Sequence, residues 1–437
     1  MAEAAAQSND TTIKRPYHAE KDSGVYVEGW RAAAMCTTLV LINSFSQIDR
    51  IFPFILAESI KTDLNLSDTQ MGLLTGLAFA VCYALLSLPL ARAADHGSPR
   101  FVLVSCILVW SVMTALGSLA ASFLFLALTR FGVAFGEAGA IPAGHALIAR
   151  KIRPEQRGFV IGLFSMGIPL GTMAGFAAGG AIADSLGWRT ALIGAGSIGI
   201  VIGLVTILVA GPTPPLGRPT SDNQPFLPTA LDLLAAPAFR WMFIGAIFLG
   251  FAFAPFYAFI APFLMRTYGY SASEAGLAFG LLQGLMGILG ALGGGHWFDR
   301  AVRSGTGKVL GPPAILLQLA SLTTTVALFI PTGWMSIALL VPCMLSFSFM
   351  MPWGFGAAHL VAGPGRQAQA SSLVMIGVGL VGPALGPILV GVLSDTATAA
   401  NIRNGLGLGL LIVPLGSALA GLAFLVANRR VADALRK

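Results

Sequence analysis

Charged residues are scarce in this chain of 437 residues, where Asp, Glu, Lys and Arg together make up only 10%. A soluble domain carries about a quarter, so the composition argues against a soluble globular protein. Hydrophobic residues make up 56% of the chain and gather into long runs. Because a membrane-spanning helix needs about 20 mostly apolar residues, the sequence predicts a polytopic α-helical membrane protein.

Cysteine is also rare, and its placement argues against two kinds of site. The four cysteines all fall in apolar runs and form no CxxC pair, so we expect neither a disulfide framework nor a metal site. No HExxH or GxSxG motif is present, and no GxxxxGK[ST] loop. These absences argue against a membrane-embedded hydrolase and against direct use of ATP. We therefore expect no enzymatic activity and no cofactor, with a proton gradient as the energy source.

Twelve apolar runs are long enough to cross a bilayer. They cover residues 31–59, 70–92, 100–120, 122–150, 158–182, 187–210, 238–265, 272–295, 308–330, 333–360, 367–393 and 403–427. Residues 211–237, which begin "GPTPPLGRPTSDNQP", separate six runs from six. We therefore predict an N-terminal tail (1–28), a six-helix bundle (29–210), a linker (211–237), a second six-helix bundle (238–428) and a C-terminal tail (429–437).

The basic residues are distributed unevenly around these helices. If both termini are cytoplasmic, the loops and tails on that side hold 20 Lys and Arg. The opposite side holds only Lys61, Arg189, Arg266 and Arg403. This asymmetry follows the positive-inside rule and predicts a cell (inner) membrane protein with cytoplasmic termini. The net charge of +7 is thus a topology signal, and we expect no nucleic-acid partner. The tail 1–28 mixes both signs and does not resemble a cleavable signal.

The two halves repeat their loop motifs. "ARAADHGSPR" with Asp95 follows the second helix, and "GHWFDRAVRSG" with Asp299 follows the eighth. "RPEQRG" with Arg157 and "GPGRQAQ" with Arg366 form a second pair. Two six-helix repeats with a linker resemble the major facilitator superfamily over nearly the whole chain. The resemblance implies a two-bundle fold and a cytoplasmic charge clasp that holds the outward-facing state.

The clasp residues implied by the resemblance are Asp95, Arg100, Asp299 and Arg300. Arg157 and Arg366 are added as further conformational residues of the same side. The first motif departs from the family pattern, because Ala91 replaces the leading glycine. His96 and Pro99 stand where basic residues are usual. An ordinary polar loop is the alternative interpretation.

Glycines recur at spacing four in the fifth helix, at Gly167, Gly171, Gly175 and Gly179. Small residues at this spacing let helices approach closely in lipid. The eleventh helix carries "GPALGP", and proline there permits a bend. We interpret the fifth and eleventh helices as sliding contacts between the halves. Static close packing is the alternative, and spacing alone does not separate the two.

Four charged residues lie inside predicted spans: Asp49 and Arg50 in "INSFSQIDRIFPFIL", and Arg130 and Glu137 in "TRFGVAFGEAGAIP". Arg130 and Glu137 are seven residues apart and share a helix face. Each charge at a helix centre costs roughly 2.5–3.5 kcal/mol or more, so the four are expected to face each other or a water-filled cavity. A purely structural ion-pair network is the alternative.

The chemistry of these four residues suggests roles. The guanidinium of Arg130, with Arg50 beside it, suits a phosphate or carboxylate head group. Glu137 and Asp49 are carboxyls shielded from water and near an arginine, which makes them candidate proton carriers. A proton on Glu137 would release Arg130, so that substrate anion and carboxylate compete for one guanidinium.

A narrower resemblance rests on "IDRIFPFILAESIKTDLNLSDTQMGLLTG", "LSLPLARAADHGSPR" and "TRFGVAFGEAGAIPAG". These segments resemble the spinster branch of the superfamily, whose members transport sphingoid and lysophospholipid molecules. The resemblance covers much of the first half and places Asp49, Arg50, Arg130 and Glu137 on the branch's motif positions. It implies a lipid substrate, whereas the second half matches only at the superfamily level.

The seventh and tenth helices carry aromatic and Met side chains and no charge within the membrane. We predict Phe253, Phe256, Tyr257, Met351 and Trp353 as substrate contacts, because a cavity with charge on one wall and apolar surface on the other suits an amphiphile. Lipid-facing positions are the alternative for each of them. We expect a monomeric secondary transporter of lysophospholipid or sphingoid phosphate. Transport of small organic anions and multidrug efflux remain open.

Overall fold

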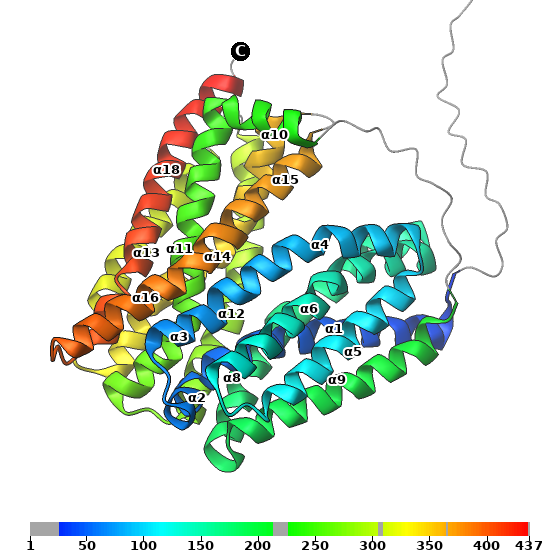
Figure 1. The fold of residues 1–437 in the computed structure, drawn as a ribbon. Coiled ribbons are helices and arrows are strands. Elements are labelled where there is room, and N and C mark those ends of the chain that lie inside the picture. The colour runs from blue at the N-terminus through cyan, green and yellow to red at the C-terminus, as the bar shows by residue number, and fades with distance from the viewer. Residues whose placement is uncertain (1–25, 213–225, 305–308, 364–365, 436–437) are drawn as a thin grey trace, which may run out of the picture.

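The computed structural model describes residues 26–212, 226–304, 309–363 and 366–435. Helices form almost all of this part of the chain, and no strand occurs in it. Figure 1 shows two bundles, one from each half of the sequence, that meet at one end and spread apart at the other. The predicted all-α fold of two six-helix bundles is confirmed.

The N-terminal bundle begins with a broken span. α1 contains Pro53 and is followed, after Leu56, by a short helix tilted by 53°. The bounds are α1 (Gly29–Ile55), α2 (Ala57–Leu64), α3 (Asp68–Gly72), η1 (Leu73–Leu77), α4 (Ala78–His96), α5 (Pro99–Gly117), α6 (Phe123–Lys151), α7 (Pro154–Ser165), α8 (Gly167–Leu186) and α9 (Trp188–Ala210). η1 is a π-helical turn inside the second span.

The C-terminal bundle has a second π-helical turn, in its eleventh span. Its bounds are α10 (Phe226–Ala235), α11 (Pro237–Tyr268), α12 (Ala272–Arg303), α13 (Gly311–Ala327), α14 (Gly333–Ala362), α15 (Gln367–Ile376), η2 (Gly377–Val381), α16 (Gly382–Ala399), α17 (Gly405–Gly409) and α18 (Ile412–Leu435). Each of the twelve predicted runs coincides with one of the spans built from these helices.

Twelve spans can be counted in the described residues. Ten helices are long and apolar enough to cross a membrane, and the bent pair α1–α2 makes an eleventh. The twelfth is α13, which has 17 residues and packs between α14 and α18. A span of 17 residues lies at the short end of the usual range.

Helix α10 lies inside the segment predicted as a linker. It contacts α11 and α15, with Ala230 and Leu233 buried. The Pro-rich stretch that suggested a linker lies mostly in residues 213–225, outside the described residues. At the other end of this half, α18 continues past residue 429, so a helix occupies part of the predicted C-terminal tail.

The two bundles are joined unevenly. We call the end that holds residue 26, α10 and the end of α18 the termini side, and the opposite end the far side. Across the halves, α8 packs on α12, and α3 and η1 pack on α16. These contacts lie toward the far side, whereas the bundles diverge toward the termini side (Figure 1).

Candidate functional site

Two helices of the N-terminal bundle place four charged side chains together inside the membrane span. α1 carries Asp49 and Arg50, and α6 carries Arg130 and Glu137. Asp49, Arg130 and Glu137 are 2%, 7% and 0% exposed, whereas the Arg50 side chain is 28% exposed. The predicted charge cluster therefore exists, and Arg50 is its most accessible member.

The pairing within the cluster differs from the sequence-based expectation. Arg50 Nε donates to Glu137 Oε2 at 2.9 Å, and its guanidinium carbon lies 4.9 Å from the Phe79 ring centroid and 5.0 Å from that of Tyr83. Arg130 Nη1 instead donates to the main-chain oxygen of Asp49 at 3.3 Å. In this conformation, protonation of Glu137 would release Arg50 rather than Arg130.

Several polar atoms of the cluster have unused hydrogen-bonding capacity. Asp49 Oδ1, Glu137 Oε1, Arg130 Nε and Arg50 Nη2 are buried and have no hydrogen-bond partner among the described residues. Since buried polar atoms are nearly always bonded, such a concentration is typical of a site that takes up water, protons or a ligand group.

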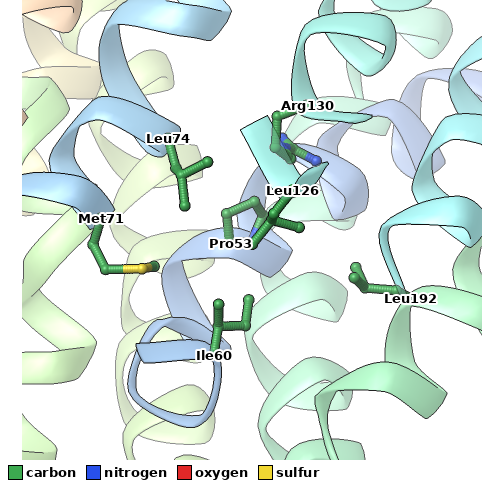
Figure 2. Close-up of a pocket in the computed structure, with 7 residues that line it drawn as sticks. All are labelled: Pro53, Ile60, Met71, Leu74, Leu126, Arg130 and Leu192. Carbon is green, nitrogen blue, oxygen red and sulfur yellow. The ribbon is translucent and has the colours of Figure 1, made fainter. Parts of the chain in front are cut away.

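Beside Arg130 lies a small cavity of about 20 Å³ with an apolar lining. Figure 2 shows Leu126 and Arg130 from α6 on one side of it and Pro53 from α1 close by. Its other lining residues are Ile60, Met71, Leu74 and Leu192. The guanidinium is the only charged group of this lining, so the cluster borders apolar space inside the N-terminal bundle.

The aromatic residues predicted on α11 form one packed group. The Phe253 ring lies 4.6 Å from Tyr257 and 5.5 Å from Phe347 of α14, centroid to centroid. Phe256 packs 5.5 Å from Phe279 of α12. Phe253 is 38% exposed, whereas Phe256 and Tyr257 are buried. Of these three predicted contacts, Phe253 is accessible to a ligand in this conformation.

The two residues predicted on α14 behave differently from each other. Met351 is exposed, whereas Trp353 is fully buried. The Trp353 ring stacks on Phe349 and meets Phe298 of α12 edge-on. Trp353 is therefore not exposed to a ligand in this conformation, because it fills the packing between α12 and α14, and its substrate contact stays a prediction.

The far side holds an ionic network that the sequence interpretation missed. Arg266 of α11 donates to Glu58 of α2 at 2.5–2.8 Å and to both oxygens of Asp68 of α3 at 2.6–2.7 Å. Asp68 is 1% exposed and also accepts from Lys61 and from Ser394 of α16, each at 2.6 Å. Within the described residues, every ion pair between the two halves involves Arg266.

Two further carboxylates join the halves at the same end. Asp395, near the end of α16, accepts from the main-chain N–H groups of Asp68 and Thr69 at 3.0 and 2.9 Å. Asp184, near the end of α8, accepts from those of Ala272 and Ser273 at 3.2 and 2.7 Å. Each carboxylate thus binds the first N–H groups of a helix in the other half, where negative charge is favoured.

A sequence signal for these contacts existed. Asp184 and Asp395 are 211 residues apart, and the helix starts that they cap, Asp68 and Ala272, are 204 residues apart. The second offset equals that between Asp95 and Asp299, and the first is two residues longer than that between Arg157 and Arg366. Acidic residues that recur at the repeat distance near the ends of spans are candidates for such interactions.

Comparison with known proteins places this architecture. A family model described as the Major Facilitator Superfamily matches residues 34–387. The chain belongs to the major facilitator superfamily. It is a multi-pass membrane transporter rather than an enzyme.

Superfamily relatives match nearly the whole chain. An MFS-type efflux pump of Mycolicibacterium smegmatis is 34% identical over 401 residues, covering 90% of this chain and 91% of that protein. Protein spinster homolog 1 of Homo sapiens is 27% identical over 440 residues, covering 90% and 80%. The crystal structure of a bacterial homologue of the human lysosomal transporter spinster, inward-facing and unoccupied, is 26% identical with a TM-score of 0.79, covering 94% and 98%.

The superfamily clasp is not formed by those of its residues whose side chains the structure describes. Asp299 and Arg300 are exposed, and Arg100 donates to the main-chain oxygen of Ile207 in its own half. The Asp95 side chain lies outside the described part of the chain. Among the described residues, the termini side carries no ion pair between the halves, so the clasp remains a prediction for another conformation.

The two arginines of the second repeated motif also bind within their own halves. Arg157 donates to the Ile152 oxygen at 3.0 Å, and Arg366 lies 4.0 Å from Asp232 of α10. Within the described part of the chain, neither binds a residue of the other half in this conformation.

The glycines at spacing four on α8 were predicted to contact the other half of the molecule. They contact α1 of the same half instead, so this prediction is wrong. Added Cβ atoms at Gly167 and Gly171 would clash with Ser44 of α1, and one at Gly175 would meet Ile51. The stripe therefore packs α8 against α1 within one half. Spacing four identifies a closely packed face but not the helix that packs on it.

Other glycines bring the halves together. Gly180 lies against the Ala272 oxygen of α12, and Gly276 lies against the Phe176 oxygen of α8. At the second contact, Gly72 and Gly391 face Pro387 and Asp68 of the opposite half. Spans five and eleven therefore do contact the opposite half, as predicted, but they do so through these glycines.

Proposed function

We propose that this protein moves an amphiphilic anionic or zwitterionic lipid, such as a lysophospholipid or a sphingoid phosphate, by proton-coupled alternating access. The observation that carries the proposal is the Arg50–Glu137 pair: a partly exposed guanidinium held by a fully buried carboxylate inside a span. An anionic head group would compete with Glu137 for Arg50, since an arginine fork suits phosphate or carboxylate.

Proton coupling follows from the same competition. Neutral Glu137 holds Arg50 less strongly, so protonation and head-group binding favour each other. Asp49 is the second candidate carrier, because its Oδ1 atom is buried without a partner among the described residues. The ring of Phe253 supplies apolar surface on α11, which contacts α1 across the halves. No cofactor is required in this scheme.

The conformation supports alternating access. The far side is held closed by Arg266, Asp184 and Asp395, while the termini side spreads apart (Figure 1). With cytoplasmic termini, as the distribution of basic residues predicts, this is an inward-facing state in the cell membrane. The site residues above would then be approached from the cytoplasm.

The test uses purified protein in liposomes, with a fluorescent lysophospholipid followed with and without an imposed pH gradient. We expect gradient-driven movement in the wild type and its loss in Glu137→Gln. Glu28→Gln is the matched control, since Glu28 forms an exposed ion pair with Arg153; it should transport normally. Lipid movement that does not depend on the pH gradient but is lost in Glu137→Gln would support the substrate site and reject proton coupling. Absence of lipid movement would reject the lipid substrate.

Efflux of amphiphilic drugs is a second candidate, favoured by the relative that is 34% identical and named an efflux pump. The same liposomes, loaded with a fluorescent amphiphilic cation, separate the two. Arg50 and Arg130 predict preference for the anion, so the cation should not move, whereas an unlabelled lysophospholipid should inhibit transport of the fluorescent lysophospholipid. Transport of the cation alone would favour efflux.

A further inference from the structure

On the far side, an open hollow of about 450 Å³ lies at the boundary between the halves. The basic side chains in its wall are Lys61 from the N-terminal half and Arg266 and Arg403 from the C-terminal half. Thr267 and Asn401 add polar groups. None of the described residues that line the hollow is acidic, so its wall presents donors and positive charge.

This concentration of cations stands out against the rest of the far side. Only four Lys and Arg fall in its predicted loops and helix ends, and three of them line this one hollow. The fourth, Arg189, is elsewhere and pairs with Asp63. Because basic residues are disfavoured on this side of a membrane protein, three cations around one concavity call for a functional explanation.

The three cations retain free donors. Lys61 Nζ uses one bond, to Asp68 Oδ1, although an ammonium has three N–H groups. Arg266 is bound to Glu58 and Asp68 through four hydrogen bonds, and a guanidinium has five donors. Arg403 is exposed, and it forms no ion pair within the described part of the chain. An anion can therefore bind here without breaking the existing network.

We propose that this hollow is a second anion site, which binds a phosphate or carboxylate group and thereby strengthens the closed far side. The group would bridge Lys61 of one half to Arg266 and Arg403 of the other. It would satisfy donors in both halves at once, so it binds the closed arrangement more tightly than the open one.

The site is separate from the charge cluster on α1 and α6, and the inference does not depend on the transported substrate. The chemistry of the ligand is shared by free phosphate and by a phospholipid head group. The hollow lies where both could reach it, at the membrane surface on the far side. The experiment therefore offers each source in turn.

Nitroxide labels at Thr62 and Thr332, both exposed and in opposite halves on the far side, report the closure of that side. Orthophosphate is titrated against the detergent-purified protein at constant ionic strength, with chloride as the reference salt. We expect a saturable rise in the fraction of short label-to-label distances and in the melting temperature. Arg403→Gln should weaken the apparent affinity roughly tenfold to a hundredfold, as expected for losing a charge-assisted bond.

Arg189→Gln is the matched control, since it removes a far-side arginine outside the hollow and should leave the titration unchanged. The lipid arm repeats the distance measurement in nanodiscs of phosphatidylcholine with and without phosphatidylglycerol. Closure by phosphatidylglycerol but not by orthophosphate assigns the site to a head group, and the reverse assigns it to a free anion. No saturable effect from either, or equal effects in wild type and Arg403→Gln, would overturn the proposal.

Discussion

The charged residues at the two ends of this transporter differ in whether they bind across the two halves. On the far side, Arg266, Asp184 and Asp395 make bonds between the halves. On the termini side, the contacts that Arg100, Arg157 and Arg366 make among the described residues lie within their own halves. Charged groups thus close one end by binding across the halves and leave the other end open. The conformation is set by which groups find partners across the interface.

The largest effect is expected from Arg266→Gln. The substitution removes all ion pairs between the halves in the described residues and leaves Asp68, which is 1% exposed, without its main partner. Breaking a buried pair in this way costs roughly 3–5 kcal/mol. We expect a lower melting temperature and a shift of label distances toward an open far side. Arg189→Gln, which breaks an exposed pair, should cost about 0–1 kcal/mol; equal losses in the two variants would show that Arg266 does not hold the gate.

A smaller effect, and a sharper contrast, is expected from two glycines of α8. Gly180→Ala places a methyl group against the Ala272 oxygen across the halves, whereas Gly171→Ala places one against Ser44 within the N-terminal bundle. Overpacking of this kind costs roughly 1–3 kcal/mol. Both variants should be less stable in thermal melts.

Label distances separate these two variants. Only Gly180→Ala should lengthen the Thr62–Thr332 distance, because only it pushes the halves apart. Gly162→Ala is a neutral reference, since its added Cβ meets nothing within 4 Å. A shift of the same size in Gly171→Ala would mean that the α1–α8 contact also controls the gate.

The smallest effect on the present state is expected from Asp299→Asn. Asp299 is exposed and forms no ion pair within the described residues, so the free energy of unfolding should change by no more than about 0.5 kcal/mol. If the clasp forms in the outward-facing state, the variant should lower the population of that state in distance measurements. Unchanged distances under all substrate and pH conditions would remove Asp299 from the clasp.

The sequence predicted the spans and the charge cluster because both follow from the free-energy cost of placing polar or charged groups in lipid, which can be read from each segment by itself. Apolar runs of about 20 residues and charges inside them leave few alternatives. It could not predict that Glu137 pairs with Arg50, because that choice depends on the rotation of α1 relative to α6. The buried position of Trp353 likewise depends on how α12 packs on α14.

The far-side network was missed for a different reason. Glu58, Lys61 and Asp68 are ordinary polar residues for a loop between spans, and only the fold brings Arg266 to them from about 200 residues away. The capping of helix starts by Asp184 and Asp395 uses main-chain N–H groups, which leave no trace in the residue types of the partner. Such contacts become predictable only when the repeat offset is applied to acidic residues.

Each of the two π-helical turns contains one residue more than an α-helical turn would, one turn in span two and one in span eleven. η1 contacts α16, and η2 lies near α4, so both turns sit in helices that face each other across the halves. When a π turn reverts to α geometry, the helix beyond it rotates by about 100° without losing its main-chain hydrogen bonds. The side chains that face the other half can therefore change when the π-helical turn moves along its helix, and the helix does not have to unwind.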